Sequence, residues 1–145
     1  MAYLTKAEFT RPTDANAYAI GDIISNSTSA GVAMNFGVGG AKLIRVSLLK
    51  STNAVDLLTK LALFSSDPGA QLDNAAFGLT YANRDTYLTT LTVGTPVVTG
   101  SIAHTELVLA QPLSINAGSL YGVLIANAAV AAGNGEQFSL RLHFL

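Results

Sequence analysis

The sequence lacks cysteine and tryptophan altogether, and it has few charged residues. Without cysteine the chain has no disulfide framework, no thiolate metal ligand and no cysteine nucleophile. Charged residues make up 12% of the 145 residues, against about 25% in ordinary soluble domains. Hydrophobic residues reach 50% and the mean hydropathy is +0.41.

The shortage of charge has two explanations. The chain could be a compact domain whose surface consists of Ser, Thr, Asn and Gly. Alternatively, partner protein covers much of the surface, because the cores of protein interfaces are depleted of charged residues. We favour the second explanation.

Charge and hydropathy also argue against two classes of partner. The net charge is −1 and no basic stripe is present, so we expect no nucleic acid, whose binding depends on phosphate neutralisation by Lys and Arg. We also expect no membrane contact, because the longest apolar stretch, residues 120–132, is interrupted by Gly122 and Asn127. It is shorter than the ~20 residues that span a bilayer. Residues 1–6 lack the apolar core of a secretion signal.

The clearest structural pattern lies at the C-terminus. Apolar residues at Phe138, Leu140, Leu142 and Phe144 alternate with polar residues. On a strand these four side chains share one face, whereas on a helix they would scatter around the cylinder. The pattern therefore predicts a half-buried strand.

Residues 41–50 show the same alternation. Ile44, Val46 and Leu48 are predicted to share one face of a strand, with Arg45 and Ser47 on the opposite face.

Residues 57–64 are apolar at nearly every position. A strand buried on both faces has this appearance, and so has a short helix over residues 55–63; periodicity leaves both open.

Further short strands are predicted from β-branched residues and turn signals. They cover residues 22–25, 87–93, 97–99, 105–110 and 120–126. Gln111 and Pro112 are expected to end the fourth of these, and a short helix is expected over residues 73–79.

Short strands separated by Gly, Pro and Asn turns predict an all-β fold, an antiparallel jelly-roll-like β-sandwich with an extended N-terminal segment. At this length one domain is expected. Residues 1–20 are expected to form an N-terminal arm or first strand, and residues 21–145 a single β-sandwich domain.

The N-terminal segment holds the candidate contact residues. If it is an arm, its aromatic, apolar and arginine side chains would anchor it to a neighbouring protein, because such residues dominate interface energies. These candidates are Tyr3, Leu4, Phe9, Arg11 and Tyr18. If the segment is instead an ordered strand, Leu4 and Phe9 belong to the core.

Catalytic chemistry finds little support. The chain has only two histidines, His104 and His143, and no ligand spacing such as HExxH. We therefore predict no catalytic residues, no metal ligands and no cofactor, and we predict that the chain is not an enzyme. Asp67 and Asp73 could contribute oxygen ligands to calcium, but a role in capping turns is the favoured reading for both.

Three stretches together resemble small structural proteins of tailed-bacteriophage heads. They are residues 9–27 (FTRPTDANAYAIGDIISNS), residues 61–68 with 73–77 (LALFSSDP and DNAAF), and residues 117–125 (AGSLYGVLI). The resemblance implies a virion structural protein, and within that class a capsid decoration or cement protein that binds the assembled head and stabilises it. It implies a jelly-roll subunit, a homo-oligomer with a trimer favoured, and the major capsid protein as partner. The implied location is the capsid surface of the virion, assembled in the cytoplasm of the bacterial host.

Two alternatives stay open. One is another structural position on the particle, in the tail, the baseplate or a head fibre. The other is a sugar-binding jelly-roll module, in which tyrosines would supply the stacking platform. The five tyrosines are Tyr3, Tyr18, Tyr81, Tyr87 and Tyr121.

Overall fold

The computed structural model describes residues 3–14, 16–37, 42–51, 58–115, 118–131 and 135–145. Its regular structure is β, apart from one 3-10 turn, η1 (Tyr81–Asn83). The strands are β1 (Tyr3–Thr10), β2 (Ala17–Tyr18), β3 (Ile23–Ile24), β4 (Met34–Gly37), β5 (Lys42–Lys50), β6 (Thr59–Phe64), β7 (Tyr87–Val93), β8 (Val97–Thr99), β9 (Ile102–Ser114), β10 (Leu120–Ala126), β11 (Val130–Ala131) and β12 (Gln137–Phe144). No helix in these ranges has the length and hydropathy of a membrane span.

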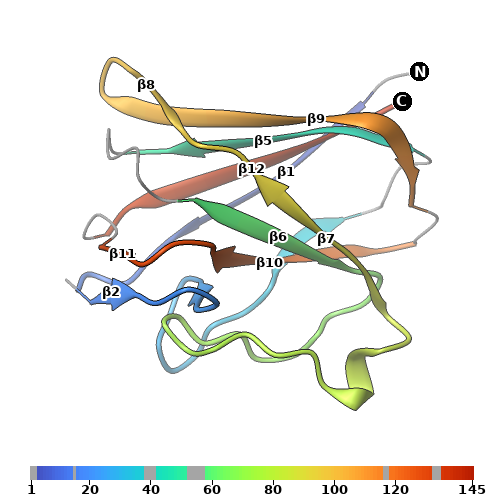
Figure 1. Ribbon diagram of the computed structural model, residues 1–145. Coiled ribbons are helices and arrows are strands. Elements are labelled where there is room, and N and C mark those ends of the chain that lie inside the picture. The colour runs from blue at the N-terminus through green and yellow to red at the C-terminus, as the bar shows by residue number, and fades with distance from the viewer. Residues whose placement is uncertain (1–2, 15, 38–41, 52–57, 116–117, 132–134) are drawn as a thin grey trace.

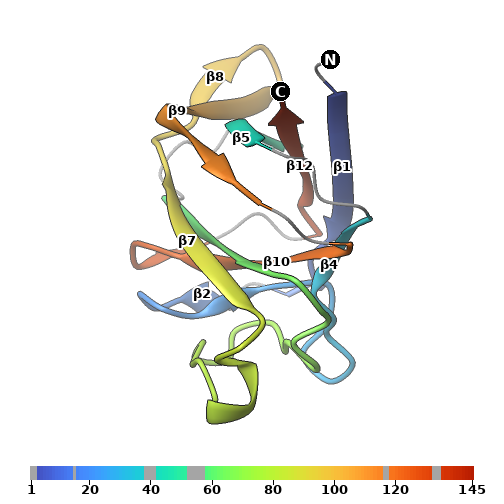
Figure 2. The ribbon, with the colours of Figure 1, turned by 90° about the vertical axis from the view of Figure 1, so that its right-hand side faces the viewer.

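Two antiparallel sheets pack face to face (Figure 1). The first sheet has the order β1-β12-β5-β9-β8, and the second has the order β3-β10-β6-β7 with β4 also beside β10. Figure 2 shows the first sheet as the upper layer and the second as the lower one. The chain passes back and forth between the layers, so that β12 returns between β1 and β5 while β10 returns between β3 and β6. This is the connectivity of a jelly roll, and it confirms the predicted fold class.

The main core lies between the two sheets. The apolar face predicted for the C-terminal strand is confirmed, since Phe138, Leu140, Leu142 and Phe144 are at most 1% exposed. They pack against side chains of the second sheet such as Leu61. The alternation along β12 thus assigns one face to the core and the other to the outside.

The second sheet is buried on both faces. In β6, Leu61 and Leu63 point into the main core, while Ala62 and Phe64 belong to a second apolar cluster. Phe77, from the long segment between β6 and β7, packs against that cluster. Residues 59–64 are therefore a doubly buried strand and the helix alternative is wrong there; residues 55–57 lie outside the described ranges.

The predicted face of residues 41–50 is only partly right. Val46 and Leu48 are fully buried, but Leu43 joins them in the core while Ile44 is half-buried. The register between β5 and β9 shifts between Leu43 and Arg45. Because a bulge reverses the alternation on one strand, Ile44 loses the position that a regular strand would give it.

The same irregularity explains why β9 does not end at Pro112. Arg45 is paired with Val108 and Leu43 with Leu113, so residues 109–112 of β9 stand opposite Ile44 alone. Proline lacks an N–H and is tolerated where the ladder is interrupted. The strand therefore continues to Ser114.

The helix expected over residues 73–79 is wrong. Asn74 has a φ of 63°, which is left-handed, and Ala76 forms an isolated β-bridge with Asp22. Asp73 accepts hydrogen bonds through its side chain from other parts of the chain. These long-range contacts hold residues 73–76 in a turn followed by a bridge, and not in a helix.

The N-terminal segment forms an edge strand. β1 pairs with β12 along its whole length, from Tyr3 opposite Phe144 to Thr10 opposite Gln137. Phe9 stacks on Phe138 with ring centroids 5.1 Å apart. Of the two expectations for residues 1–20, this pairing corresponds to the first strand.

A glycine in β10 leaves room for side chains of the two strands beside it in the second sheet. A Cβ added at Gly122 would lie 2.7 Å from Cε2 of Phe36 and 3.0 Å from Cδ1 of Leu61. We predict that Gly122→Ala lowers the free energy of unfolding by about 1–3 kcal/mol, the usual cost of overpacking a core. Urea denaturation measures the effect. Gly78→Ala is the control, because a Cβ there meets nothing within 4 Å; equal losses in the two variants would contradict the packing of β10.

Candidate functional site

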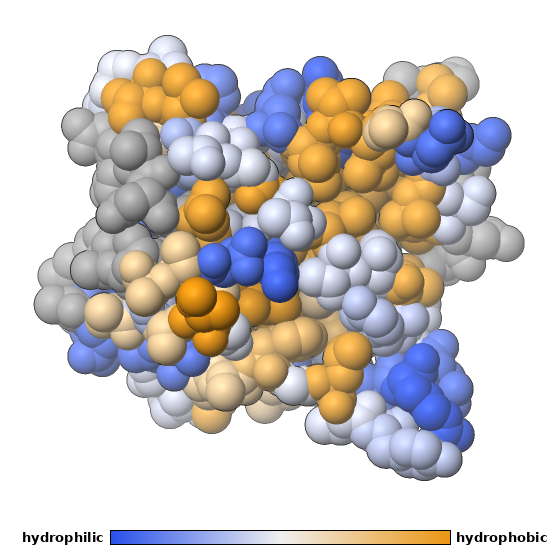
Figure 3. Space-filling model, viewed as in Figure 1, coloured by the Kyte–Doolittle hydropathy of each residue, from blue (hydrophilic) through white to orange (hydrophobic). Residues whose placement is uncertain are grey.

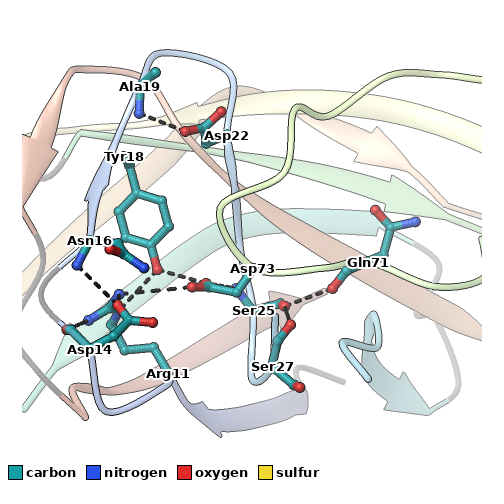
Figure 4. Close-up of polar contacts among 10 residues, drawn as sticks. All are labelled: Arg11, Asp14, Asn16, Tyr18, Ala19, Asp22, Ser25, Ser27, Gln71 and Asp73. Atoms are coloured by element: carbon teal, nitrogen blue, oxygen red, sulfur yellow. Dashed lines mark hydrogen bonds and ion pairs between the residues drawn. The ribbon is translucent and has the colours of Figure 1, made fainter. Parts of the chain in front are cut away.

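A buried polar network joins three distant parts of the chain. Arg11, Tyr18 and Asp73 are at most 4% exposed. Nε of Arg11 donates to the hydroxyl of Tyr18 over 2.9 Å, and that hydroxyl donates to Oδ1 of Asp73 over 2.7 Å. Figure 4 shows the three side chains pointing toward one another. The guanidinium also lies over the Tyr18 ring, 5.2 Å from its centroid.

Backbone groups complete the network. Oδ1 of Asp73 accepts from the amide of Ser25 over 2.8 Å. The Ser25 hydroxyl donates to the carbonyl of Gln71 over 2.7 Å. At the other end, Nη2 of Arg11 pairs with Oδ1 of Asp14 over 2.8 Å. The network therefore fixes residues 11–25 against residues 71–73.

Protonation states follow from this arrangement. Burial, and then the hydrogen bond to Asp73, raise the pKa of the Tyr18 phenol well above its usual range. Burial on its own would lower the pKa of the Arg11 guanidinium, but hydrogen bonds to Tyr18 and Asp14 outweigh it and the pKa is raised. Tyr18 thus stays neutral as a donor while Arg11 stays charged.

A second ion pair lies inside the sandwich. Nζ of Lys50 is 3.4 Å from Oε1 of Glu136, and neither side chain is exposed. The Glu136 carbonyl accepts from the amide of Arg11 over 2.9 Å, which links this pair to the first network. Charged side chains inside a protein need such partners, because an isolated buried charge is very costly.

A polar cluster occupies the outer face of the first sheet. Nη2 of Arg45 lies 3.1 Å from Nδ1 of His143. A guanidinium only donates, so Nδ1 accepts, and Nε2–H of His143 donates to the Ser47 hydroxyl over 3.1 Å. The Ser47 hydroxyl lies 3.4 Å from Oε1 of Glu106 and donates to it. Burial first, and then the charges of Arg45 and Arg141, lower the pKa of the His143 imidazole, which favours this neutral form.

This cluster surrounds a surface hollow of about 320 Å³, which we call the basic hollow. Its lining residues are Arg45, Ser47, Leu49, His104, Thr105, Glu106, Arg141 and His143. A second hollow of about 360 Å³, the apolar hollow, lies beside it and shares Leu49. Phe9, Phe138, Leu49 and Ile102 give the apolar hollow its hydrophobic lining. The rest of its lining is polar and consists of Glu8, Thr10, Lys50, Ser51, Gln137 and Ser139.

Exposed apolar side chains gather at one edge of the same sheet. Val97, Val98, Ile102 and Val108 are all 37% or more exposed and lie on β8 and β9. Figure 3 shows hydrophobic surface over the β8–β9 hairpin and along β9. β8 pairs only with residues 102–104 of β9. In the part of the chain that the structure describes, the same edge of β9 beyond residue 104 has no ladder partner.

The five candidate contact residues differ in how far the structure exposes them. Leu4 is 51% exposed on β1 and remains available to a partner. Phe9 is half-buried beside Phe138, and the side chain of Tyr3 lies outside the described residues. Arg11 and Tyr18 are corrections: they are buried in the network above, so they stabilise the chain itself and do not form a contact surface.

Sequence reasoning missed the buried charges. Asp73 was expected to cap a turn, and the pair of Lys50 with Glu136 was not foreseen. The sequence does indicate that Lys50 is buried, because Lys50 continues the apolar face formed by Val46 and Leu48 in residues 41–50. A lysine at a core position needs an acidic partner.

The tyrosines do not converge on one platform among those whose side chains are described. Tyr18 is buried and Tyr81 is exposed under Arg84, while Tyr87 and Tyr121 pack against the second apolar cluster.

The two aspartates considered for calcium have separate roles. Asp67 accepts from the amide of Gly69 in a turn, and Asp73 accepts inside the network. Within the described ranges, no three His, Asp or Glu side chains come together as a metal site.

No protein-family model matches the chain, and no curated protein is significantly similar to it in sequence. Among solved structures, it is similar to a chain of the acid-stable capsid of Helicobacter pylori bacteriophage KHP30, with 19% identity and a TM-score of 0.38. That match covers 99% of this chain and 86% of the other. It is also similar to a carbohydrate-binding module of family 29, with 12% identity, a TM-score of 0.35, and coverage of 99% and 88%. At these TM-scores neither likeness assigns a function.

The buried network generates a stability prediction. Asp73→Ala leaves the Arg11 charge and the Tyr18 hydroxyl without their inner acceptor, and we expect a loss of about 3–5 kcal/mol in the free energy of unfolding. Chemical denaturation followed by circular dichroism measures it. Asp85→Ala is the matched control: this aspartate pairs with Arg84 on the surface with 80% of its side chain exposed, so about 1 kcal/mol or less is expected. A loss at Asp73 as small as that of the control would contradict the network.

Proposed function

We propose that this chain is a structural protein of a bacteriophage particle, a capsid decoration or cement protein that binds the assembled head and stabilises it. The observation that carries the proposal is the distribution of charge. From eight basic and nine acidic residues, Arg11, Lys50, Asp73 and Glu136 are buried in ion pairs. The exterior is therefore even poorer in charge than the composition indicates, as interface cores are.

The exposed edge of the first sheet supports a second copy of this chain as one partner. Residues 97–114 contain a single charged residue, Glu106. Soluble proteins usually protect such an edge with lysine, proline or a covering segment. The proline of this range, Pro112, stands near the end of β9, away from the β8–β9 hairpin. Two copies of a nearly uncharged edge bury apolar surface without repulsion between like charges. We infer a closed homo-oligomer that covers the β8–β9 edge, with a trimer as the expected number of copies.

The resemblance to tailed-phage head proteins supports the same function. Its first stretch, residues 9–27, and the later part of its second stretch, residues 73–77, are the segments that the network between Tyr18 and Asp73 joins. The third stretch forms β10, which pairs with β3 of the first stretch and with β6. The three stretches are therefore neighbours in space, and they contribute β3, β6 and β10 to the second sheet.

Cementing follows from ordinary binding energetics. A protein that binds across the joints of a shell stabilises the assembled state over the separated subunits by mass action. Stable contacts of this kind bury at least about 1,200 Å² in total. A rigid sandwich with a neutral surface suits such broad contacts, since few charges have to be desolvated.

The first test measures binding to heads. Purified protein is mixed with assembled heads that lack it and sedimented, and the heat resistance of the loaded heads is recorded. We expect saturable binding and stabilisation by about 2.7 kcal/mol per site at a free concentration of about 100 times Kd. Protein that stays in the supernatant, or that sediments only with purified tails, would contradict a decoration role; the second result favours a tail or baseplate position.

The second test concerns the β8–β9 edge. Val97→Lys places a charge on the edge strand, and we expect it to weaken self-association at least tenfold, because a lysine on an edge disfavours edge-to-edge contact. Val32→Lys is the matched control, since both valines are 60% exposed. Analytical ultracentrifugation measures the association constant. A monomeric wild-type protein, or equal association of both variants and the wild type, would contradict this interface.

A further inference from the structure

The basic hollow on the outer face of the first sheet contains donors that the chain leaves unused. Among the described residues, the Arg141 side chain forms no hydrogen bond or ion pair, and its Nε is buried without a hydrogen-bond partner. Nε of Arg45 is also buried without a hydrogen-bond partner. These two N–H groups are closed off from solvent, so a partner in the hollow would bind the terminal NH2 groups of the guanidinium.

The charge of the hollow selects the kind of acceptor. Two guanidinium groups, from Arg45 and Arg141, line it together with one carboxylate, from Glu106. Nη1 of Arg45 is 3.9 Å from Oε2 of Glu106, which is an ion pair but too long for a hydrogen bond. His104 also lines the hollow, and the neutral His143 uses its Nε2–H on Ser47. The unbalanced charge is thus positive, in a chain whose net charge is −1.

A carboxylate fits these donors best. A guanidinium binds a carboxylate through two parallel N–H groups, and such charge-assisted bonds are stronger than neutral ones. The Arg141 guanidinium has no competing carboxylate within ion-pair distance among the described residues. Glu8, the nearest acidic residue along β1, is already paired with Lys6 at 3.2 Å.

The neighbouring apolar hollow indicates that the carboxylate belongs to a protein chain. The two hollows share Leu49, and the apolar hollow is lined by Ile102 and Phe138. Along β12, Arg141 and Gln137 are four residues apart, a distance of about 13 Å on a strand. An extended segment crossing this face would place an acidic side chain in one hollow and an apolar side chain in the other.

We propose that the basic hollow binds an Asp or Glu side chain of the neighbouring shell protein, with Arg141 as its principal partner. This proposal rests on the decoration role and adds to it which face meets the shell and what chemistry the shell presents. The β8–β9 edge is then left to contacts between copies of this chain.

The experiment compares Arg141, which lines the basic hollow on the first sheet, with an arginine far from that hollow. Arg141→Glu and Arg84→Glu make the same change of charge, but Arg84 lies beside Tyr81 in the segment that covers the second sheet. In sedimentation with heads we expect Arg141→Glu to weaken binding at least tenfold and Arg84→Glu to change it less than twofold. Arg141→Gln, which removes the charge without reversing it, should also weaken binding; circular dichroism checks that each variant is folded.

A second arm tests the hollow without heads. Wild-type protein is titrated with a short polyglutamate peptide while the Arg141 and His143 side-chain resonances are followed by NMR, and glucuronate and polylysine are titrated in parallel. We expect shifts with polyglutamate that disappear in Arg141→Gln.

The two experiments distinguish a failure of the carboxylate site from a failure of the decoration role. Heads that bind wild type and Arg141→Glu equally would overturn the carboxylate site and leave the decoration role standing. The absence of shifts with polyglutamate, or a response to glucuronate alone, would also overturn the proposed partner, whatever the heads do.

Discussion

The Asp73 carboxylate holds together the parts of this fold that the sheets alone do not connect. It accepts from the Tyr18 hydroxyl and the Ser25 amide, and it faces the Arg11 guanidinium at 3.9 Å. Tyr18 and Asp73 are 55 residues apart in the chain. Backbone hydrogen bonds, such as that from the Phe77 amide to the Gly21 carbonyl over 2.8 Å, attach the same segment to the N-terminal part of the chain. The Asp73 carboxylate adds the side-chain contact that neutralises the buried Arg11 charge.

Burying charge also determines what the outside of the molecule looks like. The paired charges of Arg11, Asp73, Lys50 and Glu136 stabilise the interior only because each has a partner. Their removal from the surface leaves an exterior in which hydroxyl, amide and apolar groups predominate. Glu106 is the single charged residue of the β8–β9 edge, and a small positively charged hollow lies on the adjacent face. Such a surface is suited to broad contacts with protein, and this is the physical basis of the proposed role on a capsid.

Much of the fold follows from alternation in the sequence. The alternation predicts β12 correctly because one face of this strand is buried along its whole length. The apolar run predicts β6 because this strand is buried on both faces. The bulge that displaces Ile44 and admits Pro112 into β9 depends on how two distant strands align, which local periodicity does not contain. The turn at Asp73 and Asn74 likewise has partners far away in the chain.

The functional surfaces were harder to predict than the strands. Arg11 and Tyr18 look like interface residues in the sequence, because aromatic and arginine side chains also serve as interface anchors; only the three-dimensional pairing shows them to be structural. The alternation along the last strand places Arg141 on its polar face, but the convergence of Arg45, His143 and Arg141 on one hollow depends on the register of β5 and β12.

A cryo-electron microscopy map of the particle that contains this chain tests the central claim most directly. The account predicts density for the jelly-roll subunit on the outer surface of the head, bridging neighbouring shell subunits through the outer face of the first sheet. Density for this subunit confined to the tail, or a subunit on the head that touches no neighbour, would contradict it.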